Sequence, residues 1–232
     1  MSKRNAFSVS LTRKQQRWAL VYLVLTIWLL PTTLTFSLEL LFPGISLALL
    51  NFVWFGVNFL CVALLFRKFW TASIERLGHD PVRLWIVVCV GLVAYFVLTS
   101  GLSLALIWLR PDFFNVNDSA ISGLFSQDFA LMAVGTVLLV PVAEEFLYRG
   151  FVFGSLYPKN RVLAYLVSTT LFCAIHILGY LGIYDPITLL LCFCQYIPAG
   201  LCLAWAYRTA DNLFAPIFMH AIINALGIFA QR

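Results

Sequence analysis

Long apolar runs alternate with short polar segments along the whole chain of 232 residues. Seven of these runs are close to or above the roughly 20 residues that an α-helix needs to cross a bilayer. They lie at about residues 18–37, 45–66, 84–109, 128–157, 162–179, 186–207 and 213–230. The runs are continuous and do not alternate at every second residue, which favours helices over the strands of a transmembrane barrel. The pattern predicts an all-α, polytopic bundle of about seven transmembrane helices.

No repeat or low-complexity tract divides the chain. We expect residues 1–126 to form an N-terminal cytoplasmic tail with three accessory spans, and residues 127–232 to form a core of four spans. Prolines inside membrane helices are tolerated and often kink them. Such kinks are expected at Pro31, Pro141, Pro198 and Pro216.

Lysine and arginine are unevenly distributed among the polar segments. The N-terminal tail carries five of them, including Lys3 and Arg4, and the 67–83 segment carries four, whereas the 38–44 and 180–185 segments carry none. Cytoplasmic segments are enriched in these residues, so the N-terminus is predicted to be cytoplasmic and, with seven spans, the C-terminus external. The net charge of +5 is therefore a signal of orientation, and nucleic acid is not an expected partner.

Composition supports a membrane protein, because 62% of residues are hydrophobic and 11% charged, against about 25% charged in soluble domains. The six cysteines all fall inside apolar runs and form no CxxC pair. They are predicted to be small buried side chains, not metal ligands or disulfide partners.

The stretch "PVAEEFLYRGFVF", residues 141–153, places three ionisable side chains inside an expected span. An unpaired charge at the bilayer centre costs about 2.5–3.5 kcal/mol even on the mildest scale, and such residues are functional candidates. Glu145 and Arg149 are four residues apart with the acid first, so we expect them to pair on one helix face. Glu144 lies about 100° further around the helix and is left to face another group.

Two later spans carry further polar candidates, in "FCAIH" with Phe172 and His176, and in "HAIIN" with His220 and Asn224. Glu144 and His176 are each about 16 residues from the turn near residue 160, or roughly 24 Å at 1.5 Å per residue. His220 reaches the same depth if the hairpin around residue 160 projects about 9 Å beyond the next turn. Each of these side chains alone has a structural explanation, as a packed or helix-joining polar group. Their common depth favours one site.

In this order, "EEFLYR", "FCAIH" and "HAIIN" match the motifs EExxxR, FxxxH and HxxxN. The chain from about residue 128 to 230 thereby resembles the CPBP family of CAAX proteases and bacteriocin-processing enzymes, also called the Abi family. The resemblance implies an intramembrane endopeptidase acting on a membrane-associated or lipidated peptide or protein, in a bacterial inner (plasma) membrane. Glu144 would activate water, His176 would hold the water, and His220 with Asn224 would bind the oxyanion, with Glu145, Arg149 and Phe172 in support.

A metal mechanism stays open at this point. Glu144, His176 and His220 would make a His₂Glu set like those of catalytic zinc sites, although no HExxH helix is present and Asn224 is a poor zinc ligand. Two other functions also remain: a non-catalytic membrane scaffold or bacteriocin-immunity protein that keeps the fold, and a small transporter. A transporter is less favoured because no repeated halves are found.

Overall fold

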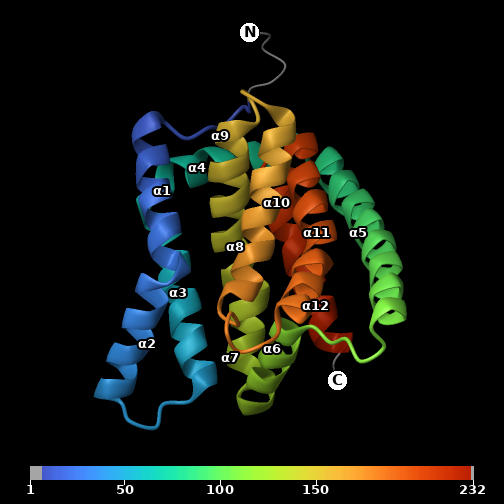
Figure 1. The fold of residues 1–232 in the computed structure, drawn as a ribbon. Coiled ribbons are helices and arrows are strands. Elements are labelled where there is room, and N and C mark those ends of the chain that lie inside the picture. Colours follow the sequence, from blue (N-terminus) through green and yellow to red (C-terminus); the bar gives the residue numbers. More distant parts are fainter. Residues whose placement is uncertain (1–6, 231–232) are drawn as a thin grey trace.

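The computed structural model describes residues 7–230 and shows a bundle of helices packed side by side (Figure 1). The helices are α1 (Arg13–Ile27), α2 (Leu29–Leu41), α3 (Leu47–Leu65), α4 (Arg67–Glu75), α5 (Pro81–Leu109), α6 (Val116–Gln127), α7 (Phe129–Val134), α8 (Val140–Glu145), α9 (Gly154–Leu156), α10 (Arg161–Leu178), α11 (Pro186–Ala210) and α12 (Phe214–Ala230). A 3₁₀ turn, η2 (Arg76–Gly78), follows α4, and two π-helical segments, η3 (Gly135–Leu139) and η4 (Phe146–Phe153), flank α8. The segments from α7 to α9 form one continuous helix, Phe129–Leu156.

The expected helical membrane bundle is confirmed, and the number of spans is close to the prediction. By length and hydropathy, five described helices qualify as spans: α3, α5, Phe129–Leu156, α10 and α11. The bent pair α1 and α2 makes a sixth. The last predicted span corresponds to a shorter apolar helix, Phe214–Phe229, so seven was an approximate count.

The first span is broken for a reason that the sequence contains. α1 and α2 meet at an angle of 51° around Trp28. Pro31 lacks the N–H that would bond to the Ile27 carbonyl, and its ring crowds that carbonyl. The helix therefore ends at Ile27 and restarts at Leu29.

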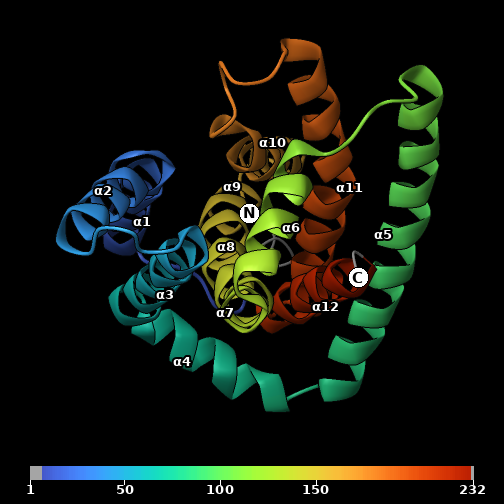
Figure 2. The ribbon, with the colours of Figure 1, turned by 90° about the horizontal axis from the view of Figure 1, so that it is seen from below.

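The bundle has a buried centre and a lipid-like periphery. In the most apolar window of each span, 44% of Phe129–Leu156 and 50% of α11 are buried, against 17% of α3 and 22% of α5. Figure 2 shows the same arrangement, with α1 to α3 on one side, α5 on the other, α6 to α12 between them, and α4 along the edge from α3 toward α5. The large side chains that are fully enclosed include Phe66, Phe146, Phe153, Phe172, Leu203 and Met219. The candidate site therefore lies on the best-packed helices.

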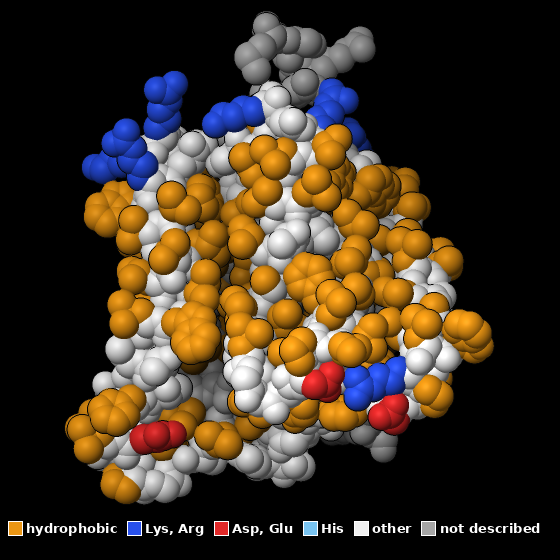
Figure 3. Space-filling model, viewed as in Figure 1, with side chains coloured by type: hydrophobic (Ala, Val, Ile, Leu, Met, Phe, Trp, Pro, Cys, Tyr) orange, Lys and Arg blue, Asp and Glu red, His pale blue; other side chains and the backbone are white. Residues whose placement is uncertain are grey.

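Charged side chains gather at the two ends of the molecule, with an apolar band between them (Figure 3). Lysine and arginine cluster at the end where α1 begins and α9 turns into α10, and acidic side chains appear at the other end. Lys3 and Arg4 lie outside the described residues. The uneven distribution of lysine and arginine seen in the sequence thus appears as a difference between the two ends of the bundle. Which end faces the cytoplasm stays a prediction.

Candidate active site

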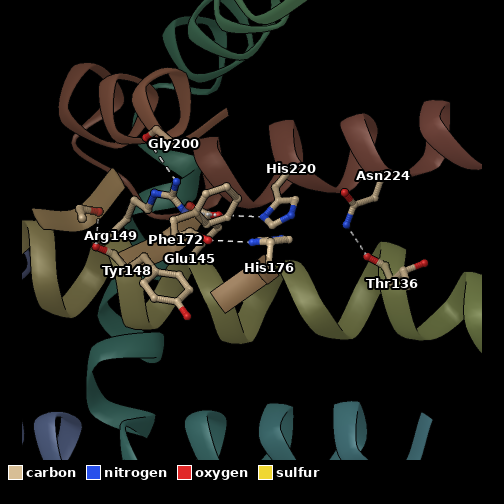
Figure 4. A network of polar contacts seen from close by, with 10 residues as sticks. Thr136, Glu145, Tyr148, Arg149, Phe172, His176, Gly200, His220 and Asn224 are labelled. Carbon is tan, nitrogen blue, oxygen red and sulfur yellow. Dashed lines mark hydrogen bonds and ion pairs between the residues drawn. The ribbon is translucent and has the colours of Figure 1, made fainter. Parts of the chain in front are cut away.

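The candidate side chains come from three helices that lie side by side in the centre of the bundle (Figure 4). Glu144 and Glu145 end α8, and Arg149 follows in η4. Phe172 and His176 lie near the end of α10, and His220 and Asn224 lie on α12. The turn before α10 extends beyond the ends of α11 and α12 (Figure 1), as the depth argument required.

Glu145 and Arg149 form the expected ion pair. Arg149 Nη1 donates to Glu145 Oε1 at 2.7 Å, and both side chains are 0% exposed. Arg149 Nη2 also donates to the Gly200 carbonyl at 3.3 Å, and the guanidinium lies 4.3 Å from the centre of the Phe172 ring. Buried charges require such partners, because their desolvation cost is several kcal/mol per ion.

His220 shares the same carboxylate, a contact that the sequence did not predict. His220 Nδ1 lies 2.8 Å from Glu145 Oε1, and the imidazole is 4% exposed. A carboxylate only accepts hydrogen bonds, so Nδ1 carries the proton and Nε2 points away from the pair. Glu145 thereby fixes the orientation of His220, as a buried acid does in catalytic triads.

His176 is oriented by its own helix and by a neighbouring ring. Its Nδ1 lies 2.7 Å from the Phe172 carbonyl oxygen. Since a carbonyl can only accept, Nδ1 is the protonated nitrogen of the neutral ring, and Nε2 keeps a lone pair for a water or a proton. The ring also stacks on Tyr196 of α11, with centroids 4.2 Å apart and an interplanar angle of 28°.

Asn224 caps a carbonyl that the π-helical segment η3 leaves unpaired. Val140 N–H bonds to the Gly135 carbonyl instead of the Thr136 carbonyl, and Pro141 has no N–H to offer. Asn224 Nδ2 donates to that Thr136 oxygen at 2.8 Å. Its amide has a second N–H, which this contact leaves for another acceptor.

Glu144 is partly buried, and its environment differs from that of Glu145. Its carboxylate interacts electrostatically with Tyr148 and Arg149. Its Oε2 is enclosed and accepts no hydrogen bond from the residues that the structure describes. A buried carboxylate oxygen without a donor is costly. Glu145 Oε2 is also enclosed without a partner, so the two acids differ in that Glu145 Oε1 already accepts from Arg149 and lies against His220.

Comparisons with known proteins point to the same segment. Residues 126–226 match the sequence model described as "Type II CAAX prenyl endopeptidase Rce1-like". This segment, which is less than half of the chain, is similar to the Rce1-like family. It contains all seven candidate residues, and the resemblance to the CPBP family seen in the motifs is confirmed.

Two bacterial relatives are similar to longer parts of the chain. The UPF0177 protein YxdF of Lactococcus lactis is 23% identical over 58% of this chain and 71% of its own length. The putative membrane peptidase YdiL of Bacillus subtilis is 30% identical over 45% of this chain. That match spans 39% of YdiL. No solved structure matches.

The Rce1-like segment does not assemble an evident metal site. Within residues 7–230, no group of three or more His, Cys, Asp or Glu side chains is placed to hold an ion. Glu144, His176 and His220 therefore do not fit a three-ligand zinc centre. His176 Nδ1 and His220 Nδ1 are engaged by Phe172 and Glu145, which leaves Nε2 of each ring as the nitrogen open to a ligand. We assign no step to a metal.

The site includes residues that the motifs did not reveal. Thr136 binds Asn224, and Tyr196 stacks on His176. The Tyr196 hydroxyl is in turn held by polar residues at the start of α6, Asn115 and Asp118, which precede the Rce1-like segment. A sequence signal existed, because "QY" interrupts an apolar span and intramembrane polar residues are functional candidates.

Proposed function

We propose that the protein is an intramembrane endopeptidase of the CAAX-protease type that uses a glutamate-activated water. The family and the name of the Bacillus relative support a membrane peptidase. The observation that supports the mechanism is that the two adjacent glutamates have different partners. Each acid has one enclosed oxygen without a partner among the described residues, but Glu145 is held through its other oxygen by Arg149 and His220, and Glu144 has no such contacts.

In this mechanism Glu144 removes a proton from a water that also donates to His176 Nε2. A carboxylate in an apolar site is a stronger base than one in water. The water oxygen bonds to the scissile carbonyl carbon, and the resulting oxyanion accepts hydrogen bonds from the second Asn224 N–H and from Nε2–H of His220, which in this step is protonated on both nitrogens. Glu144 then gives its proton to the amide nitrogen as the C–N bond breaks, which restores the carboxylate.

The proposed substrate is a membrane-associated or lipidated peptide or protein. The three motif helices are embedded in a bundle whose outer band is apolar (Figure 3), so a lipid-anchored peptide would already be concentrated where the site lies. The family model is described for enzymes that act on prenylated CAAX proteins. We propose that the chain resides in a bacterial plasma membrane with the Lys- and Arg-rich end in the cytoplasm.

Cleavage of a reporter peptide by purified protein tests this function. Fluorogenic peptides with and without a C-terminal isoprenyl group would be compared. We expect Glu144→Gln to reduce kcat by about 10²–10⁴, the range for removal of a general base. Glu39→Gln is the matched control, because Glu39 is exposed on α2, and it should retain full activity.

Two outcomes would contradict the proposal. Wild-type rates in folded Glu144→Gln would remove Glu144 from the mechanism, and absence of cleavage of any lipidated peptide would favour the scaffold or immunity function. Activity that is lost on chelation and restored by stoichiometric zinc would reassign Glu144 from base to metal ligand.

A further inference from the structure

Tyr196 occupies a place between the proposed catalytic histidine and a polar cluster at the start of α6. One face of its ring stacks on His176 at 4.2 Å. Its hydroxyl donates to Asp118 Oδ1 at 2.8 Å and lies 3.2 Å from Asn115 Oδ1. Asn117 Nδ2 donates to the same hydroxyl at 3.1 Å. The first turn of α6 thus supplies three side chains to one oxygen atom.

The α6 turn is itself well anchored. Asn115 caps the helix by accepting from the backbone N–H groups of Asn117 and Asp118 at 3.0 and 3.1 Å. Its Nδ2 donates to Gln195 Oε1 at 2.8 Å, which ties the turn to α11. Tyr180, after α10, donates to Asn117 Oδ1 at 3.3 Å. Figure 2 shows α6 lying against α10 and α11. The turn therefore joins the helix of His176 to the helix of Tyr196.

His176 needs such a support, because its other described contacts come from Phe172 of its own helix: a hydrogen bond to the backbone and a ring contact with centroids 4.8 Å apart. The hydrogen bond from Nδ1 to the Phe172 carbonyl sets the tautomer, yet neither of these contacts reaches the ring from another helix to limit its rotation. A flat aromatic face in stacking contact restricts that rotation and directs Nε2. Small misplacements of a reacting group of about 1 Å cost up to about 10²-fold in rate.

We propose that Tyr196, locked by Asn115, Asn117 and Asp118, is a positioning residue that holds the His176 imidazole in its working orientation. The inference rests on the proposed peptidase function for its kinetic consequence. It also makes α6, which precedes the matched family segment, part of the active-site architecture. Tyr196 itself is not expected to touch the reacting atoms.

Three variants distinguish the contribution of the Tyr196 ring from that of its hydroxyl group. Tyr196→Leu removes the stacking face and should lower kcat by roughly 10- to 100-fold with little change in KM. Tyr196→Phe keeps the ring but loses the three hydroxyl contacts, and should give a smaller loss. Tyr184→Leu is the matched control, since Tyr184 is 38% exposed and does not contact His176 among the ring pairs described.

A second measurement does not depend on cleavage. Carbethoxylation of His176 by diethylpyrocarbonate, followed by mass spectrometry, would report how freely the ring moves, with exposed His79 as internal reference. The rate at His176 relative to His79 should rise from wild type to Tyr196→Phe to Tyr196→Leu. If wild type proves inactive on every peptide, the proposed function fails while this ratio still decides the role of Tyr196.

The outcomes are discriminating. Wild-type kcat and a wild-type modification ratio in folded Tyr196→Leu would overturn the proposal. A raised KM at unchanged kcat would overturn it too, by making Tyr196 a substrate contact. If Tyr196→Leu does not accumulate, Tyr196→Phe and Asp118→Ala are measured instead. A wild-type kcat and a wild-type modification ratio in both variants would exclude a role for the contacts between the Tyr196 hydroxyl and the start of α6.

Discussion

At the scale of single residues, the site depends on how two adjacent glutamates are used. Glu145 is completely buried and accepts from Arg149 and His220 through the same oxygen. Glu144, one residue earlier, has no such set of donors among the described residues. The two residues are of the same type, so it is their environment that makes Glu145 a structural acid and Glu144 a candidate base.

Arg149→Ala is expected to destabilise the protein strongly. It removes the charge that compensates Glu145, and loss of one partner of a buried pair costs about 3–5 kcal/mol. Thermal unfolding in detergent should show a clearly lowered Tm. Arg67→Ala, at an exposed position on α4, is the control and should unfold as wild type does.

A double-variant cycle checks the cause of that loss. Combining Arg149→Met with Glu145→Gln removes both charges, so the double variant should be more stable than the sum of the two single losses predicts. Strict additivity of the two losses would contradict a direct Glu145–Arg149 interaction.

At the scale of helices, irregular geometry brings the motifs together. The π-helical segments η3 and η4 flank the two glutamates, and such segments are frequent at functional sites. η3 leaves the Thr136 carbonyl to Asn224. On α11, Gly200 has no side chain and lies close against Thr169 of α10. The Gly200 carbonyl accepts a hydrogen bond from Arg149. A Cβ at Gly200 would lie 2.6 Å from Thr169 Cγ2.

Gly200→Ala should therefore reduce stability by about 1–3 kcal/mol, the usual cost of overpacking. Cleavage should fall as well, because the shift would move the carbonyl that holds Arg149. Gly101→Ala is a matched control: that glycine is helical, and an added Cβ would meet nothing within 4 Å. It should be neutral or slightly stabilising.

A compensating change tests the steric argument. Thr169→Ser removes the methyl group nearest to the new Cβ, so it should recover part of the stability lost in Gly200→Ala. Lack of any recovery in the double variant would show that the close approach of the two backbones, not the methyl group, sets the cost.

At the scale of the whole molecule, the two ends differ in charge and the candidate active site lies in the centre of the bundle. The described part of the N-terminal segment does not extend freely from the bundle. Phe7 stacks on Tyr207 at 4.5 Å, and Ser8 N–H donates to Asp211 Oδ1 at 3.0 Å. Phe7 and Ser8 are thus held against the basic end of the bundle.

Sidedness of labelling tests the predicted orientation. In a Cys89→Ser background, which removes the exposed cysteine, Lys159→Cys would place a thiol at the turn before α10, and Asp112→Cys would place one at the opposite end. A membrane-impermeant maleimide applied to intact cells should label only the second. Labelling of the first from outside would reverse the proposed topology, because it would put the Lys- and Arg-rich end in the wrong compartment.

Several features of this protein follow from the sequence without a structure. Helical spans are specified locally, since the bilayer requires continuous apolar runs of sufficient length and satisfied backbone groups. The Glu145–Arg149 pair also follows from local geometry, because residues four apart share a helix face. The break near Trp28 could likewise be expected from Pro31, which cannot bond to the helix before it.

Contacts between helices were decided by tertiary packing. The His220–Glu145 contact spans 75 residues, and Tyr196 meets Asp118 across 78. No periodicity within one helix fixes which rotation and depth a neighbouring helix adopts. Those are set by close approaches such as Gly200 against Thr169 and by where buried polar groups find partners. The sequence by itself therefore determined the membrane helices, the chemistry available in them and the Glu145–Arg149 pair, and only the packing decided which histidine shares the Glu145 carboxylate and which side chain supports His176.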